Sequence, residues 1–155
     1  MTVTIPLEPA ERTRFEAMWN AAPGMLHMGA RADFSDPGAV RVTIQPLQPV
    51  HRGGLGTDAV NGAVITGLCD VALGMVGHFH TMGRRAGTAQ LNIQFLRPVL
   101  GDGVRAVGRL VRAGTNLVFA TVEVEDMNGR VCARCDGIVA VSGARTQEHR
   151  GQVAL

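Results

Sequence analysis

One carboxylate stands inside the most apolar stretch of this chain. The segment GTDAVNGAVITGLCDVALGMVGHF, residues 56–79, reads as the start of a buried helix, and it places Asp70 among Val, Ile, Leu, Cys and Met side chains. Aspartate is almost never fully buried without a partner, because burial removes the water that stabilises its charge. Asp70 is therefore a candidate general base or nucleophile. The competing interpretation is a structural carboxylate bonded to a backbone or Thr group.

Other motifs that carry chemistry are weak or missing. Cys132 and Cys135 form a lone CxxC, but no second pair or nearby His completes a zinc site, so we assign it no function. GLGTDA fits GxGxxA without a surrounding βαβ unit. The absence of lysine excludes a Walker phosphate loop, and the sequence contains no GxSxG elbow. We therefore expect no metal and no cofactor.

Composition limits the partners. The 155 residues are 46% hydrophobic and 18% charged, which is typical of a globular protein. The formal charge of +2 comes from scattered arginines, and with one Trp and no Tyr there is no base-stacking platform, so we expect no nucleic-acid partner. The start lacks a signal-peptide pattern, no uncharged apolar run reaches about 18 residues, and the three cysteines are an odd number. These features favour a cytoplasmic location and no membrane partner.

Periodicity and turn signals predict the elements that position Asp70. We expect a leading helix over 8–20, two strands over 24–34 and 39–47 joined at SDPG, and a glycine-rich loop over 48–60. In that loop His51 is expected to be solvated. After the central helix, alternating segments predict four strands, over 86–99, 102–114, 116–129 and 130–143.

These elements predict an α+β fold in a single domain, residues 1–155, with a frayed tail over 143–155. A long central helix is expected to lie against a curled, mostly antiparallel sheet of five or six strands. The helix is apolar nearly all round, and one modest sheet covers only one side of it. We therefore expect part of its surface to meet another subunit.

The central segment resembles the hotdog-fold acyl-CoA thioesterases, in particular the group typified by phenylacetate-degradation thioesterases. That group carries His-Gly-Gly at the start of the central helix and an acidic residue nine positions after the His. Here NGAVITGLCDVALG gives Asn61-Gly62-Ala63 and then Asp70. TAQLNIQFLRPV and the segment 106–141 are similar to later strands of the family, so the resemblance covers about residues 40–141.

The resemblance implies a hotdog fold and hydrolysis of an acyl-CoA, or an equivalent carrier thioester, to free acid and thiol. A helix amino terminus can stabilise the oxyanion formed in that reaction. The donors implied are the N–H groups of Gly62 and Ala63, with the amide of Asn61 in place of the family's His, although N-capping alone explains Asn61. Asp70 would act on water or attack directly. Thr88 would orient the water or Asp70, and the competing interpretation is an ordinary strand Thr.

Three further residues are candidates for binding the substrate. Asp58 could supply a second carboxylate, although stabilising the helix start is the simpler role. Arg97 could meet an anionic part of the substrate, and Met75 could line an aliphatic or aryl pocket.

Helix geometry connects the site to oligomeric state. The nine residues from Asn61 to Asp70 turn the two side chains about 180° apart and separate them by roughly 13 Å along the helix. One chain is therefore not expected to bring both to one carbonyl. Two antiparallel helices related by a twofold axis could, so we expect a homodimer or a dimer of dimers. The competing hypotheses are a non-catalytic acyl-CoA-binding or regulatory protein and a purely structural dimer.

Overall fold

The computed structural model describes residues 7–54, 56–81 and 84–142, so the tail predicted over 143–155 lies outside the described residues. The leading helix predicted over 8–20 is present as α1. The elements, in chain order, are α1 (Pro9–Asn20), α2 (Pro23–Met28), β1 (Ala30–Asp33), β2 (Val40–Ile44), a 3-10 turn (Pro49–His51), β3 (Arg52–Gly54), β4 (Ala59–Val60), α3 (Gly62–His80), β5 (Arg85–Phe95), β6 (Val104–Ala113), β7 (Leu117–Asp126) and β8 (Val131–Ser142).

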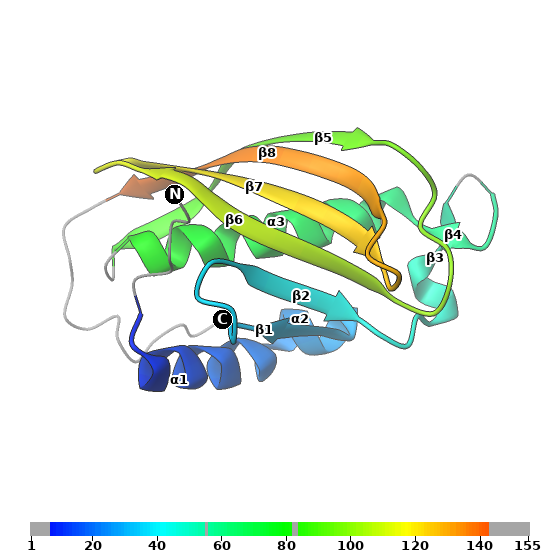
Figure 1. Ribbon diagram of the computed structural model, residues 1–155, viewed down its shortest axis with the longest axis horizontal. Helices are drawn as coiled ribbons and strands as arrows, with labels where there is room; N and C mark the ends of the chain where they lie inside the picture. Colours follow the sequence, from blue (N-terminus) through cyan, green and yellow to red (C-terminus); the bar gives the residue numbers. More distant parts are fainter. Residues whose placement is uncertain (1–6, 55, 82–83, 143–155) are drawn as a thin grey trace.

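Six strands form one antiparallel sheet in the order β1-β2-β6-β7-β8-β5. Figure 1 shows the sheet curling over α3, which lies along one face of it. The predicted α+β class, the central helix and the curled antiparallel sheet are confirmed.

Helix α3 and the sheet approach each other closely where glycines replace larger side chains. A Cβ placed on Gly77 of α3 would lie 2.6 Å from Cγ1 of Val139, and one placed on Gly137 of β8 would lie 2.5 Å from Cδ2 of Leu73. Both distances are far below van der Waals contact. The two glycines therefore allow the helix to pack close to the sheet. This packing also sets the distance between Asp70 and β5.

Two local predictions were wrong. Residues 24–28 were expected in a strand, but Pro23–Met28 form the short helix α2, with proline in its first turn and Gly29 in the left-handed conformation as its C-cap. Residues 48–60 were expected to form a glycine-rich loop, yet β3 and β4 pair within this segment as a small antiparallel ribbon. This ribbon leads the chain into the start of α3.

The two edges of the sheet differ. At β1, the Asn20 side chain of α1 donates to the carbonyl of Ala32 at 2.9 Å and accepts from the N–H of Ala32 at 2.7 Å. Glu16 of α1 accepts from the N–H of Phe34 at 2.9 Å. At the other edge, β5 pairs with β8, and no other described strand pairs with it. Side chains therefore occupy one edge, and an eleven-residue strand forms the other.

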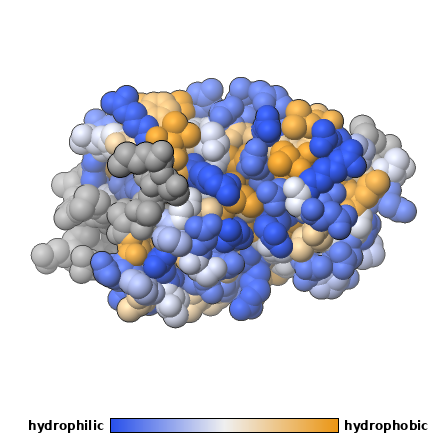
Figure 2. Space-filling view, viewed as in Figure 1, coloured by the Kyte–Doolittle hydropathy of each residue, from blue (hydrophilic) through white to orange (hydrophobic). Residues whose placement is uncertain are grey.

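Helix α3 is long and apolar enough to cross a membrane by length and composition alone. Its packing explains that composition, because the residues on its inner face lie in the core against the sheet. Figure 2 shows apolar patches, in orange, that interrupt a mostly polar surface. Among the described residues, the exposed large apolar side chains are Leu26, Val50, Phe95, Leu96, Leu100, Val111 and Leu117.

Candidate functional site

Asp70 is exposed in the single chain, so its burial stays a prediction about the contact between two subunits. Its apolar neighbours Leu68, Cys69 and Leu73 point into the core, whereas Asp70 faces the other side of α3. There it lines an open hollow of about 540 Å³ between α3 and β5. We call this the Asp70 hollow; its lining is Ala63, Thr66, Gly67, Asp70, Thr88, Ala89, Gln90 and Leu91.

An irregularity in β5 turns Thr88 toward this hollow. Thr88 pairs with Val139 of β8 and Gln90 pairs with Ile138, so Ala89 is an extra residue in a β-bulge. Val139 faces α3, and Thr88, directly opposite, shares that face. Leu91 also lies on the helix side, although three residues of a regular strand would place it on the opposite face. The bulge therefore lets both Thr88 and Leu91 line the hollow.

At the start of α3, Asn61 is a working N-cap. Its backbone is extended, at φ −63° and ψ 138°, and its side-chain oxygen accepts from the N–H of Ala63 at 2.8 Å. The carbonyl of Asn61 accepts from the N–H groups of Val64 at 3.0 Å and Ile65 at 3.2 Å. The Ala63 N–H is therefore occupied, and it could serve as an oxyanion donor only if the cap bond opened.

One backbone donor of the first helical turn remains unused. Within the described part of the chain, the N–H of Gly62 has no hydrogen-bond partner, and neither does the side-chain nitrogen of Asn61. Both lie at the positive end of the helix dipole. The sequence-predicted donor pair of Gly62 and Ala63 thus becomes, in this structure, the pair of the Gly62 N–H and the Asn61 amide.

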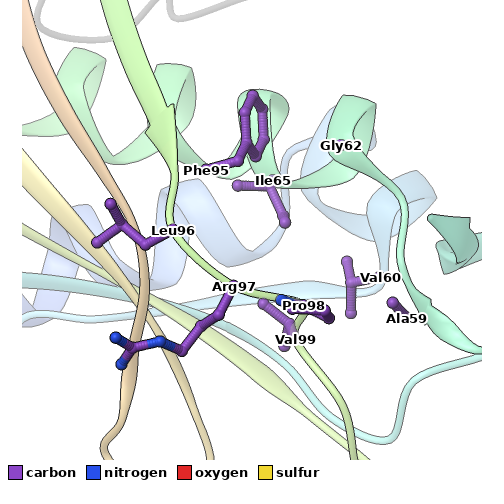
Figure 3. Close-up of a pocket in the computed structure, with 9 residues that line it drawn as sticks. All are labelled: Ala59, Val60, Gly62, Ile65, Phe95, Leu96, Arg97, Pro98 and Val99. Carbon is purple, nitrogen blue, oxygen red and sulfur yellow. The ribbon is translucent and has the colours of Figure 1, made fainter. Parts of the chain in front are cut away.

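Gly62 borders a second hollow, of about 500 Å³, which Figure 3 shows in close-up. The ring of Phe95 stands beside Ile65 and the start of α3 in this view. We call it the Phe95 hollow; its lining is Ala59, Val60, Gly62, Ile65, Phe95, Leu96, Arg97, Pro98 and Val99. Its wall is apolar except for the Gly62 backbone and Arg97.

The three residues predicted to contact the substrate lie in different places in the structure. Met75 is fully buried in the core and borders neither hollow, which counts against a role in binding. Arg97 borders the Phe95 hollow, but its guanidinium points toward β8 and donates to the carbonyl of Val131 at 3.0 Å. Asp58 is exposed in the turn before β4, outside both hollows.

His51 was expected to be solvated but is buried, and sequence reasoning missed its role. Its Nδ1 accepts from the N–H of Gln48 at 2.9 Å, which leaves the proton on Nε2, 2.9 Å from the carbonyl of Met28. Its own carbonyl accepts from the N–H of Asn61 at 2.8 Å. His51 therefore ties the end of α2 to the N-cap of α3. Its partners are backbone groups, which leave no signal in the sequence.

The three thiols are poor candidates for a nucleophile. Burial raises the pKa of Cys69 to about 12, with the neighbouring Cys135 and Asp70 adding to the effect, so the thiolate is suppressed. Burial also raises the pKa of Cys132 and Cys135. Across residues 7–54, 56–81 and 84–142, no group of three or more His, Cys, Asp or Glu side chains could hold a metal ion.

The structure thus distributes the predicted residues over two neighbouring places. Asp70, Thr88 and Ala63 line the Asp70 hollow, and Gly62 borders the Phe95 hollow beside its cap, Asn61. A carboxylate on one face of α3 and free N–H donors at its start are the two components that acyl transfer to water requires.

Residues 58–133 match the model of the thioesterase superfamily, and this segment contains the helix start, Asp70 and the strand that follows. This segment belongs to the thioesterase superfamily. It is 31% identical over 93 residues to the medium/long-chain acyl-CoA thioesterase YigI of Escherichia coli K12. That match covers 51% of this chain and 60% of the relative, less than two thirds of its length.

Solved structures of thioesterase-superfamily proteins share the fold. A Shewanella oneidensis protein related to the superfamily has a TM-score of 0.76 at 20% identity, over 88% of this chain and 99% of that chain. The Escherichia coli PaaI protein from the phenylacetic acid degradation operon has a TM-score of 0.68 at 18% identity, over 88% and 94%. The hotdog fold expected from the resemblance is confirmed.

Proposed function

We propose that this protein hydrolyses acyl-CoA thioesters to a free acid and CoA. The observation that carries the proposal is the unpartnered N–H of Gly62, which lies at the helix start and borders an apolar hollow able to take an acyl chain. The similarity to an acyl-CoA thioesterase, over 51% of this chain, supports it.

In the proposed reaction the thioester oxygen lies on the N–H of Gly62, with the Asn61 amide as a second donor. These donors stabilise the oxyanion as water attacks the carbonyl carbon. Asp70 accepts the proton from that water, and Thr88 orients it. When the tetrahedral intermediate collapses, the C–S bond breaks and the CoA sulfur leaves and takes up a proton. Direct attack by the Asp70 carboxylate, followed by hydrolysis of the anhydride, would use the same groups.

The active site is proposed to be shared between two subunits. Asp70 and Asn61 of one helix are roughly 13 Å apart along its axis, too far to meet one carbonyl. A twofold partner with an antiparallel α3 would bring its Asp70 to the Gly62 of the first chain. Two observations support such a pairing: β5 has an edge without a described partner strand, and the exposed face of α3 carries Ala63, Gly67 and Gly74 around Asp70.

A second candidate function is acyl-CoA binding without turnover. The N-cap bond favours it, because it occupies the Ala63 N–H and leaves a single backbone donor at the helix start. Release of free thiol from a panel of acyl-CoAs, with short, long and aryl acyl groups, separates the two functions. Binding without thiol release would support the second function and contradict the first.

The shared site is tested with complementary variants. Gly62→Pro deletes the free N–H at the first helical position, where proline is preferred, and Asn61 already has the extended backbone that a residue before proline requires. Gly62→Ala is the matched control, because it keeps the N–H and its Cβ would lie 3.6 Å from the Phe95 ring, an ordinary contact. Loss of one such donor is expected to lower kcat by about 10²–10³.

Homodimers of Gly62→Pro and of Asp70→Asn are both expected to be nearly inactive. A mixed dimer would contain one site with both parts intact and one with neither, so differently tagged, co-expressed heterodimers should recover about half of the wild-type kcat per dimer. An inactive heterodimer would contradict the shared site, while activity of the wild type would still stand as evidence for hydrolysis.

A further inference from the structure

Phe95 is a large apolar side chain that the single chain leaves 57% exposed at the end of β5. It pairs with Ala133, a buried residue of β8, so its ring lies on the helix side of the sheet. A Cβ placed on Gly62 would lie 3.6 Å from Cε1 and 3.7 Å from Cζ of the ring. The edge of the ring therefore bounds the space next to the unpartnered N–H of Gly62.

The surroundings indicate what that space would hold. Ile65 and Val60 face the same hollow, and the guanidinium of Arg97 is directed away from it to β8. A group that placed its oxygen on the Gly62 N–H would therefore put its neighbouring carbon against an apolar wall, next to the ring edge. That edge carries the positive part of the aromatic quadrupole, which suits a developing oxyanion.

We propose that Phe95 determines acyl specificity by excluding acyl groups that are branched, or that carry a ring, at the carbon attached to the carbonyl. This inference rests on the proposed function and deepens it. Linear acyl groups, and aryl groups separated from the carbonyl by a methylene, pass the ring edge. Groups such as benzoyl or 2-methyl-branched acyl collide with it.

The structure offers a matched control for this role. Leu100 is exposed to a similar extent, 58%, and lies in the connection that follows β5, but it does not border the Phe95 hollow. If acyl specificity depended only on exposed apolar surface, Leu100→Ala and Phe95→Ala would change it alike. If the position over Gly62 matters, only Phe95→Ala changes specificity.

The test compares kcat/KM for hexanoyl-CoA, 2-methylbutanoyl-CoA and benzoyl-CoA in the wild type, Phe95→Ala, Phe95→Leu and Leu100→Ala. The ratio of benzoyl to hexanoyl activity is expected to rise at least about tenfold in Phe95→Ala, the scale on which a pocket discriminates by small differences in volume. Phe95→Leu should lie between, and Leu100→Ala should match the wild type. An unchanged ratio in both Phe95 variants would overturn the inference, and Phe95→Leu decides if Phe95→Ala does not fold.

Two further readouts separate the other outcomes. Sedimentation of each variant reports subunit contacts, and conversion of Phe95→Ala, but not Leu100→Ala, to monomers would overturn the inference in favour of an interface role for the ring. If the wild type releases no thiol from any acyl-CoA, the proposed hydrolysis fails. Calorimetric Kd values for the same three thioesters then test whether Phe95 selects among acyl groups. If the ratio of the Kd for benzoyl-CoA to the Kd for hexanoyl-CoA were the same in Phe95→Ala as in the wild type, the inference would be overturned.

Discussion

At the scale of the residue, Asp70 combines two properties that do not usually occur together. It belongs to a strongly apolar helix, yet in the single chain its carboxylate is exposed beside Thr88 and a bulged strand. The charge of Asp70 therefore destabilises the folded single chain very little. The proposed partner subunit would be what removes it from water.

Asp70→Asn is expected to lower kcat by about 10²–10⁴, the usual contribution of a positioned base. The variant should remain folded, because a side chain of equal size replaces one that the single chain leaves exposed. Thiol release from acyl-CoA and a thermal melt check both parts. Full activity in the variant would remove Asp70 from the mechanism.

The cysteines make a second prediction at this scale. Burial raises the pKa of Cys69 to about 12 from an ordinary value of 9.0. The chain contains no Tyr and no Lys, so the other side chains that titrate near this range are Cys132 and Cys135, whose pKa burial also raises. Above pH 9 the unfolded state loses the Cys69 proton while the folded state keeps it, so the free energy of unfolding falls as pH rises. The contribution of this one thiol is a slope of about 1.4 kcal/mol per pH unit.

Urea denaturation between pH 8.5 and 10.5 measures that slope. Cys69→Ala is the reference, since it removes the titrating group at the cost of a small cavity, and its slope should be shallower than that of the wild type. Equal slopes in the two proteins would contradict a suppressed thiolate at Cys69.

At the scale of the element, the sequence predicted the helices and strands whose apolar residues recur with a regular period. The strands after α3 largely alternate between turn signals, so β5 to β8 were all expected, as were α3 and its cap at Asn61. Helix α2 was missed because Met-Leu-His-Met fits a strand and a short helix equally well, although Pro23 and Gly29 mark both of its ends. The ribbon β3–β4 was missed because glycines carry no side-chain pattern.

The candidate site could be predicted only in part for related reasons. The helical pattern placed Asp70 in α3 but could not tell which face of the helix the sheet covers. The bulge at Ala89 depends on the register with β8, and the brace from His51 depends on backbone carbonyls. These are long-range properties, which spacing along one chain does not contain.

Gly137→Ala tests how the elements fit together. The added methyl would lie 2.5 Å from Cδ2 of Leu73 and 2.9 Å from the carbonyl oxygen of Gln90, next to the bulge. We expect a loss of about 1–3 kcal/mol in the free energy of unfolding, the usual cost of overpacking. Because the methyl also pushes on the bulged strand, kcat should fall as well. Gly87→Ala in β5, where a Cβ would meet nothing within 4 Å, is the control, and equal stability of the two variants would contradict this packing.

At the scale of the whole molecule, the exposed face of α3 is the surface on which the shared site depends. A Cβ on Gly74 would meet nothing within 4 Å in the single chain, so Gly74→Arg is accommodated there and removes a helix-weakening glycine. Against a packed partner helix the same side chain would collide. We expect a folded monomer without activity, as measured by sedimentation and thiol release.

Gly24→Arg is the matched control, because a Cβ there also meets nothing within 4 Å and the residue belongs to another helix, α2. It should keep the oligomeric state and the activity of the wild type. A Gly74→Arg variant that remained oligomeric would contradict an interface on this face of α3.

The hydrogen bonds from Asn20 and Glu16 of α1 to the β1 edge affect how many copies of the chain can join through their sheets. A sheet with two open edges can recruit copies on both sides and grow into a ribbon without limit. Here Asn20 bonds both the N–H and the carbonyl of Ala32, and Glu16 accepts from the N–H of Phe34, so a pair joined through β5 would present outer edges that are partly occupied by side chains. Growth would stop at two chains in that direction. In the double variant Asn20→Ala, Glu16→Ala the stop is removed, and light scattering should then rise with protein concentration and time, whereas the wild type should stay constant.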